Sequence, residues 1–128
     1  MAVLVVKPNT VENMKFLFRA NVLDGSGRKA DVPGFIVGGK TGTAEKVVHG
    51  RYSSSVRFNA FLSAFPIQDP KYVVLVVIDE PKAAKEGGGV TAGSNAAPMV
   101  GNIIRRAAAL LGVKPKFGKD GNALLVSY

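Results

Sequence analysis

The sequence contains no cysteine, no tryptophan and a single histidine, His49, in 128 residues. Without cysteine, disulfide bonds and thiolate metal sites are excluded, and the redox compartment cannot be inferred. One histidine excludes a histidine-based metal cluster, and its polar, glycine-flanked surroundings predict a loop position. No apolar run is long enough to span a membrane, and residues 1–6 are too short for a secretory signal sequence. We therefore expect neither a metal nor a cofactor.

Acidic residues are also scarce, with 9 Asp and Glu against 17 Lys and Arg and a formal net charge of +8. Basic proteins often bind nucleic acid or membranes. Here the basic residues are scattered, without a long run or interleaved aromatic residues. This pattern favours a solvated basic surface and no nucleic-acid partner. A hydrophobic content of 47% suits one soluble globular unit with a modest core.

Cap residues and apolar periodicity predict two helices. The first begins near Asn9 and ends at Asp24-Gly25-Ser26-Gly27. The last is capped by Ser94 or Asn95 and ends at Gly112. The first is expected to bury Val11, Met14, Leu17, Phe18 and Val22, and the last Val100, Ile103, Ile104, Ala107, Ala108 and Leu111.

Three strands are predicted between the helices, at residues 35–48, 56–65 and 72–78. A polar turn is expected over residues 49–55, and the third strand, a continuous Val-rich run, is expected to be central and buried on both faces. Short connections indicate an antiparallel meander. The predicted class is α+β, with an antiparallel sheet of about three strands, a preceding helix and a C-terminal helix packed on the sheet.

Most of the candidate chemistry lies in Gly38-Gly39-Lys40-Thr41-Gly42-Thr43-Ala44, which holds one lysine, two hydroxyls and three glycines. Glycine lets a ligand approach the main chain. Threonine hydroxyls can donate hydrogen bonds to a carboxylate, and the lysine can stabilise an anionic group or a developing oxyanion. The alternative is a surface hairpin with a solvated lysine.

One specific interpretation of this stretch is a phosphate loop. Residues 34–41 match G-x-x-x-x-G-K-[ST] letter for letter, and residues 74–80 resemble the accompanying apolar strand that ends in an acid. A phosphate loop must open a helix, however. Phe35-Ile36-Val37 favours a strand, and Thr41-Gly42-Thr43 contains poor helix formers.

The other interpretation is the K-T-G element of penicillin-binding serine acyl-transferases. The longer string resembles the class B penicillin-binding proteins, the peptidoglycan D,D-transpeptidases of cell division and elongation, and is most similar to the division type. The resemblance covers roughly residues 9–113 and is carried by Val32-Pro33-Gly34, Val37 to Lys46, Phe61 to Pro66, Lys71 to Pro81 and Ala96-Ala97-Pro98.

The resemblance implies a partial transpeptidase fold, which is serine β-lactamase-like. Residues 1–113 would be the C-terminal portion of the transpeptidase domain and residues 114–128 a tail. Lys40 and Thr43 would be catalytic: Lys40 faces the cleft and supports the proton relay, and the Thr43 backbone N–H is one of two oxyanion donors. Thr41, Gly42 and Thr43 would bind substrate, the threonines through the terminal carboxylate of a D-Ala-D-Ala stem peptide or a β-lactam. Gly42 lets the substrate lie as an added strand.

Two other family motifs are missing. Ser26-Gly27-Arg28-Lys29 matches S-x-x-K by letter, but a serine between glycines in a turn does not place the pair on one helical face. No serine begins an S-x-N or S-x-D sequence. We therefore expect a C-terminal fragment that alone forms no acyl-enzyme and needs the missing N-terminal part of the domain.

The family is anchored in the inner membrane with its catalytic domain in the periplasm or outside the cytoplasm. An alternative is a non-catalytic remnant or interaction module that binds division proteins or anionic wall material. Because strands supplied by a missing part would be lost, we also expect an exposed sheet edge.

Overall fold

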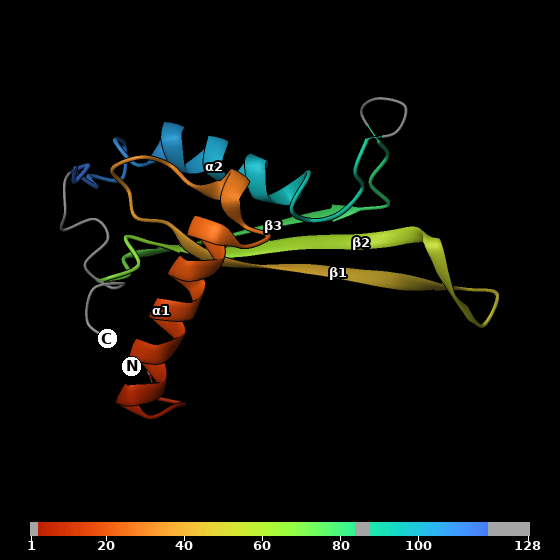
Figure 1. Ribbon diagram of the computed structural model, residues 1–128, viewed down its shortest axis with the longest axis horizontal. Coiled ribbons are helices and arrows are strands. Elements are labelled where there is room, and N and C mark those ends of the chain that lie inside the picture. Colours follow the sequence, from red (N-terminus) through yellow and green to blue (C-terminus); the bar gives the residue numbers. More distant parts are fainter. Residues whose placement is uncertain (1–2, 84–87, 118–128) are drawn as a thin grey trace.

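The chain forms a three-stranded sheet with one helix on its face and a second helix at one end (Figure 1). The computed structural model describes residues 3–83 and 88–117. This arrangement confirms the α+β class predicted from the sequence. The elements in chain order are α1 (Pro8–Asp24), the 3-10 turn η1 (Arg28–Ala30), β1 (Gly38–Val48), β2 (Arg51–Phe65), β3 (Tyr72–Asp79) and α2 (Ala96–Ala107).

The sheet is an antiparallel meander in the order β1-β2-β3, as predicted. His49 and Gly50 join β1 to β2 with φ angles of 51° and 78°, the left-handed geometry of a two-residue hairpin turn. The predicted turn over residues 49–55 is therefore wrong, because the chain reverses within two residues and β2 already begins at Arg51. The β1–β2 hairpin projects well beyond the helices (Figure 1).

Strand β1 begins later than predicted, at Gly38 rather than at residue 35. Ile36 has a φ of 49°, which breaks the extended conformation. Its carbonyl accepts a hydrogen bond from the Ile67 N–H at 2.9 Å. Ile36 and Val37 are both buried. Tertiary burial in a bent segment therefore overrides the strand preference of these β-branched residues.

Strand β3 is an edge strand of the sheet over the described residues, because β2 lies between β1 and β3. The prediction of a central strand buried on both faces is wrong. Val76 is 7% exposed, whereas its neighbour Leu75 is 59% exposed. We call the buried side the covered face (Phe61, Phe65, Val76) and the other side the open face (Leu62, Val73, Leu75, Val77).

Helix α2 lies on the covered face and closes the core (Figure 1). The Asn95 side chain caps it, accepting a hydrogen bond from the Ala96 N–H at 2.6 Å, as one of the two predicted caps. Its buried positions are Ala96, Ala97, Val100, Gly101 and Ile104.

The predicted stripe of α2 is correct at Val100, Ile104 and Ala108 but wrong at Ile103 and Leu111, which are exposed. The helix ends at Ala107, and the chain continues through turns to Gly112. A Cβ at Gly101 would lie 3.1 Å from the Lys29 carbonyl oxygen. Gly101 therefore lets α2 approach η1 closely, and Ile103, two residues further on, lies on the opposite side of the helix.

Helix α1 buries only part of the set of residues predicted. Val22 is buried, but Met14 and Leu17 are 40% and 54% exposed, so the predicted face is wrong at these two positions. The N-terminal half of α1 leads away from the sheet (Figure 1). Val11, Met14 and Phe18 line an apolar cavity of about 230 Å³ together with Ala64, Ile67 and other residues.

Arg19 is the buried charged residue of α1. Its Nη1 donates hydrogen bonds to Asp31 Oδ1 and to the Val37 carbonyl, both at 2.8 Å. These bonds join α1 to the segment that leads into β1. The helix therefore fixes where the K-T-G strand begins.

The described part of the C-terminal region, residues 113–117, is irregular and lies against Gly34. The Lys116 N–H donates to the Gly34 carbonyl at 2.7 Å. The predicted tail over 114–128 is only partly described, since residues 118–128 lie outside the described residues. The boundary between residues 113 and 114 stays a prediction.

Candidate functional site

Strand β1 places the backbone of the K-T-G stretch against the core. A Cβ at Gly38 would lie 2.5 Å from Ile67 Cγ1, and one at Gly39 would lie 2.6 Å from Phe61 Cε1. Internal packing therefore requires glycine at both positions. At Gly42 the nearest atom to such a Cβ, from Ala60, is 3.8 Å away. The fold of this chain does not itself require glycine at position 42.

Lys40 and Thr41 form a polar pair on this strand. Lys40 Nζ donates to the Thr41 carbonyl oxygen at 2.7 Å and to Thr41 Oγ1 at 3.3 Å. Lys40 is exposed and Thr41 is half-buried. Within residues 3–83 and 88–117, β1 is an edge strand of the sheet. The structure thus brings these two predicted site residues together where a ligand can reach them.

Thr43 lies two residues further along β1, on the same face as Thr41. Its Oγ1 accepts a hydrogen bond from the Ala92 N–H at 3.2 Å. The segment that precedes α2 therefore contacts the K-T-G strand directly. This contact fixes the Thr43 side chain next to the site.

Ser26 reaches the same site from the turn that follows α1. Its Oγ lies 2.7 Å from Thr41 Oγ1 and donates to Asn21 Oδ1 at 3.2 Å. Sequence reasoning considered Ser26 only as a nucleophile and missed this contact. In the sequence, Ser26 is a hydroxyl residue between two glycines at the end of a helix. This pattern does not indicate a contact with a distant strand.

Ser26 lacks the geometry of an S-x-x-K nucleophile. It lies in a turn after α1, and Lys29 belongs to the separate 3-10 turn η1. The two residues therefore do not share one face of a helix, as the motif requires. This geometry agrees with the expectation that Ser26 is not the attacking serine.

The phosphate-loop interpretation fails on the same strand. A phosphate loop opens a helix directly after its lysine. Here Lys40 and Thr41 lie within β1, which continues to Val48 and pairs with β2. No helix N-terminus is available at these residues to receive phosphate.

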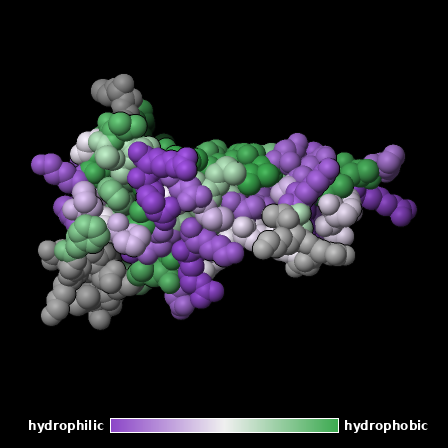
Figure 2. Space-filling view, turned by 90° about the horizontal axis from the view of Figure 1, so that it is seen from above, coloured by the Kyte–Doolittle hydropathy of each residue, from purple (hydrophilic) through white to green (hydrophobic). Residues whose placement is uncertain are grey.

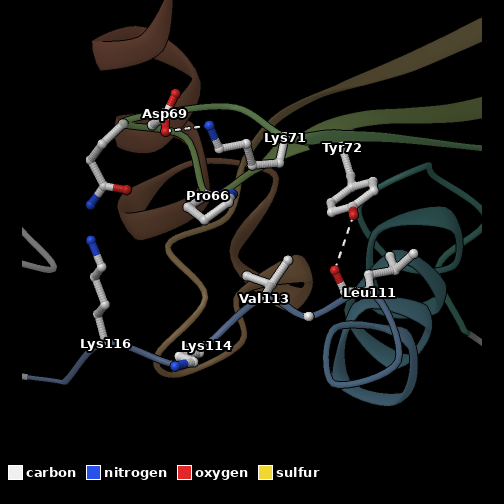
Figure 3. A pocket seen from close by; sticks show the side chains of 10 residues that line it. Pro66, Asp69, Lys71, Tyr72, Leu111, Val113, Lys114 and Lys116 are labelled. Atoms are coloured by element: carbon white, nitrogen blue, oxygen red, sulfur yellow. Dashed lines mark hydrogen bonds and ion pairs between the residues drawn. The ribbon is translucent and has the colours of Figure 1, made fainter.

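A separate basic pocket of about 510 Å³ lies where β2 ends and β3 begins (Figure 3). Lys71, Lys114 and Lys116 line it, none of them from β1. Lys71 Nζ is paired with Asp69 Oδ2 at 2.6 Å, and this hydrogen bond with its charge lowers the pKa of Asp69 below its usual 3.8. The Tyr72 hydroxyl donates to the Leu111 carbonyl at 3.0 Å. This pocket does not share residues with the K-T-G site.

The described ranges 3–83 and 88–117 contain neither a candidate metal site nor a membrane-spanning helix. No group of three His, Asp or Glu side chains is placed to hold a metal ion. No helix in these ranges combines the length and the hydrophobicity needed to cross a membrane.

The sequence matches the family described as penicillin binding protein transpeptidase domain over residues 1–105. It is 41% identical to stage V sporulation protein D of Bacillus subtilis, covering 88% of this chain and 17% of that protein. It is 44% identical to the probable peptidoglycan D,D-transpeptidase FtsI of Caulobacter vibrioides, covering 88% of this chain and 21% of that protein. The chain thus spans about a fifth of these relatives.

Solved structures show the same fold. Penicillin-binding protein 3 of Mycobacterium tuberculosis, complexed with ampicillin, matches with a TM-score of 0.76 and 28% identity over 90% of this chain and 27% of that chain. The transpeptidase domain of penicillin-binding protein 3 from Burkholderia pseudomallei matches with a TM-score of 0.76 and 31% identity over 89% of this chain and 34% of that chain. The chain therefore belongs to the penicillin-binding protein transpeptidase family, and its relatives are class B enzymes.

Proposed function

We propose that this chain supplies the K-T-G strand of a peptidoglycan D,D-transpeptidase whose nucleophilic serine comes from a separate part of the domain. Thr41 and Thr43 bind the terminal carboxylate of a D-Ala-D-Ala stem peptide, or that of a β-lactam. The Thr43 N–H stabilises the oxyanion, and Lys40 supports proton transfer and the electrostatics of the site. The observation that carries the proposal is the Lys40–Thr41 pair on the accessible edge strand β1.

The absence of a side chain at Gly42 supports this assignment. Glycines 38 and 39 are explained by close contacts inside the chain, whereas a Cβ at Gly42 would meet only Ala60, at the ordinary contact distance of 3.8 Å. A ligand that lies along β1 as an added strand can approach the main chain closely at a residue without a side chain. An anionic ligand there meets the ammonium group of Lys40 and the hydroxyl of Thr41, which together favour a carboxylate.

In the proposed reaction, the serine hydroxyl of the other part adds to the carbonyl of the penultimate D-Ala. The new C–O bond places negative charge on the carbonyl oxygen, which accepts a hydrogen bond from the Thr43 N–H. The terminal D-Ala then leaves with a proton delivered through the relay that includes Lys40. In a β-lactam, the bond that breaks is the lactam C–N bond.

The exposed apolar residues of the open face support the proposal that a further part of the domain covers this side of the sheet. Leu62, Val73, Leu75 and Val77 are all exposed there, and a sheet with one bare apolar face is normally covered. A view from above shows hydrophobic side chains along one long side of the molecule and hydrophilic ones over much of the rest (Figure 2). The proposed partner is an upstream transpeptidase segment that carries S-x-x-K and S-x-N and acts outside the cytoplasm.

The test is to co-express this chain with the upstream transpeptidase segment of the Bacillus subtilis relative and to add a penicillin. Intact mass spectrometry should show a stoichiometric adduct on the upstream segment and none on this chain alone. Lys40→Ala should reduce the acylation rate by about 100-fold or more, because it removes charge stabilisation from the site.

The matched control is Lys46→Ala, on the same strand but paired with Asp79 and Glu80. It should leave the acylation rate within about twofold. An adduct on a serine of this chain alone overturns the division of roles. A folded, stable complex that never reacts with penicillin favours the non-catalytic interaction module instead.

A further inference from the structure

We propose that Ser26 is a positioning residue of the carboxylate site: it accepts a hydrogen bond from the Thr41 hydroxyl in the free site and donates one to it when a ligand is bound. The inference rests on the proposed function and extends it to a residue outside the K-T-G stretch. Its basis is a continuous chain of hydrogen bonds from Lys40 through Thr41 and Ser26 to Asn21.

The orientation of Asn21 sets the direction of this chain. Asn21 Nδ2 donates to the Gly39 carbonyl at 2.8 Å, which identifies the nitrogen side of the amide, because a carbonyl oxygen accepts and cannot donate. Asn21 Oδ1 therefore points to Ser26, 3.2 Å from its Oγ. Since this oxygen is an acceptor, the single Ser26 proton is directed to it.

It follows that Ser26 accepts from Thr41. With the Ser26 proton donated to Asn21, the 2.7 Å contact between the two hydroxyls needs the Thr41 proton. In the free site, Thr41 therefore donates to Ser26 and accepts from Lys40 Nζ, which is 3.3 Å from its Oγ1. The Thr41 oxygen is fixed before any ligand arrives.

A carboxylate ligand reverses one link of the chain. A carboxylate only accepts hydrogen bonds, so Thr41 must turn its proton towards the ligand. Ser26 then rotates its own hydroxyl from Asn21 Oδ1 to Thr41 Oγ1, so the Ser26–Asn21 hydrogen bond is given up and the contact between the two hydroxyl oxygens is retained. The change needs two hydroxyl rotations and no displacement of heavy atoms. Such preorganisation keeps the reorganisation cost of binding low.

The backbone around Ser26 is held from two sides. A Cβ at Gly93 would lie 2.7 Å from the Ser26 carbonyl oxygen, and one at Gly27 would lie 2.9 Å from Asn21 Nδ2. The segment before α2 and the end of α1 therefore both pack closely around this turn. This packing keeps Ser26 opposite Thr41.

The first experiment uses the assembled enzyme described above and two probes, benzylpenicillin and its methyl ester, which lacks the carboxylate. Ser26→Ala should lower the ratio of the two acylation rates, free acid to ester, by about 10-fold, since a hydrogen-bonded group that supports a charged ligand is lost. Ser26→Thr, which keeps the hydroxyl, should retain the wild-type ratio within about twofold. A merely structural role lowers both rates together and leaves the ratio unchanged, which would overturn the proposal.

The matched control is Ser55→Ala, which removes a serine that forms a similar hydroxyl pair with Ser53 at 2.9 Å, on the projecting hairpin. Its rate ratio should equal that of the wild type. Thermal unfolding of each variant shows whether it is folded.

The second experiment uses the 128-residue chain alone and acetyl-D-alanyl-D-alanine, with its C-terminal amide as the uncharged comparison. The amide resonances of Gly42 and Thr43 should respond to the acid more than to the amide, and Ser26→Ala should weaken that response at least fivefold. Absence of any preference for the acid in the wild-type chain would overturn the role of Ser26.

The two experiments separate the two claims. If the assembled enzyme does not react but the chain prefers the acid through Ser26, the proposed function fails and the Ser26 assignment stands. If the enzyme reacts and Ser26→Ala changes neither readout, the Ser26 assignment fails and the function stands.

Discussion

The two faces of the sheet have similar apolar residues and different surroundings. Phe61 is fully buried beneath α2, while Leu62, its neighbour in the same strand, is 41% exposed on the open face. Along β3, Val76 is buried and Leu75 is 59% exposed. The contribution of an apolar residue to this chain's stability is therefore set by whether another element packs on its side of the sheet, and not by its hydrophobicity alone.

The largest effect is expected when one residue on each face of β2 is replaced by alanine. Phe61→Ala should lower the free energy of unfolding by roughly 3–5 kcal/mol, because it opens a cavity in the core. Leu62→Ala, the control from the open face, should cost less than about 1 kcal/mol. Chemical denaturation measures both, and equal losses would show that the open face is also packed.

The next largest effect is expected at the polar link between α1 and the segment that leads into β1. Arg19→Met should cost roughly 3 kcal/mol, because it leaves the Val37 carbonyl and Asp31 without the guanidinium. The control is Arg105→Met on α2, whose exposed guanidinium donates a hydrogen bond to Asn102 Oδ1 at 2.8 Å. That change should stay within about 0.5 kcal/mol. A similar cost at both positions would mean that burial of Arg19 contributes nothing.

The smallest effect is expected from the exposed pair Asp69–Lys71 beside the basic pocket. The hydrogen bond and charge of Lys71 lower the pKa of the Asp69 carboxyl below 3.8, so the pair stabilises the fold above the ordinary pKa of this carboxyl. That contribution is lost as the pH falls through the lowered value. In an NMR titration, Lys71→Met should return the Asp69 midpoint towards 3.8. An unchanged midpoint would show that Lys71 does not cause the shift.

The sequence predicted more of the topology than of the burial. The meander, the two helices and the Asn95 cap follow from local signals such as strand propensity, turn residues and cap oxygens. The turn over residues 49–55 was predicted too long because a polar run favours a turn, although β2 begins at Arg51 and Ser53 already pairs with Lys46 of β1. The exposure of Leu17 and Leu75 was not predictable, because periodicity shows which residues share a face but not whether that face is covered.

Some residues of the candidate site were also predictable from the sequence, and others were not. Lys40, Thr41, Gly42 and Thr43 were identified from one contiguous stretch, and their proposed roles rest on the resemblance to transpeptidases. Ser26 and Asn21 were missed as site residues, because they come from the end of α1 and no sequence period links them to β1. The contacts Ser26–Thr41 and Asn21–Gly39 exist only after the helix has packed on the strand.

By itself, the sequence determined the family, the antiparallel meander and the residues of the K-T-G strand, because each depends on short-range patterns of residue type. The tertiary structure decided that Ile36 bends the chain before β1, that β3 is an edge strand of the described sheet, and that Ser26 meets Thr41. These features depend on which surfaces of distant segments pack together. That choice is set by the total of buried area and satisfied hydrogen bonds, which no single stretch of the chain contains.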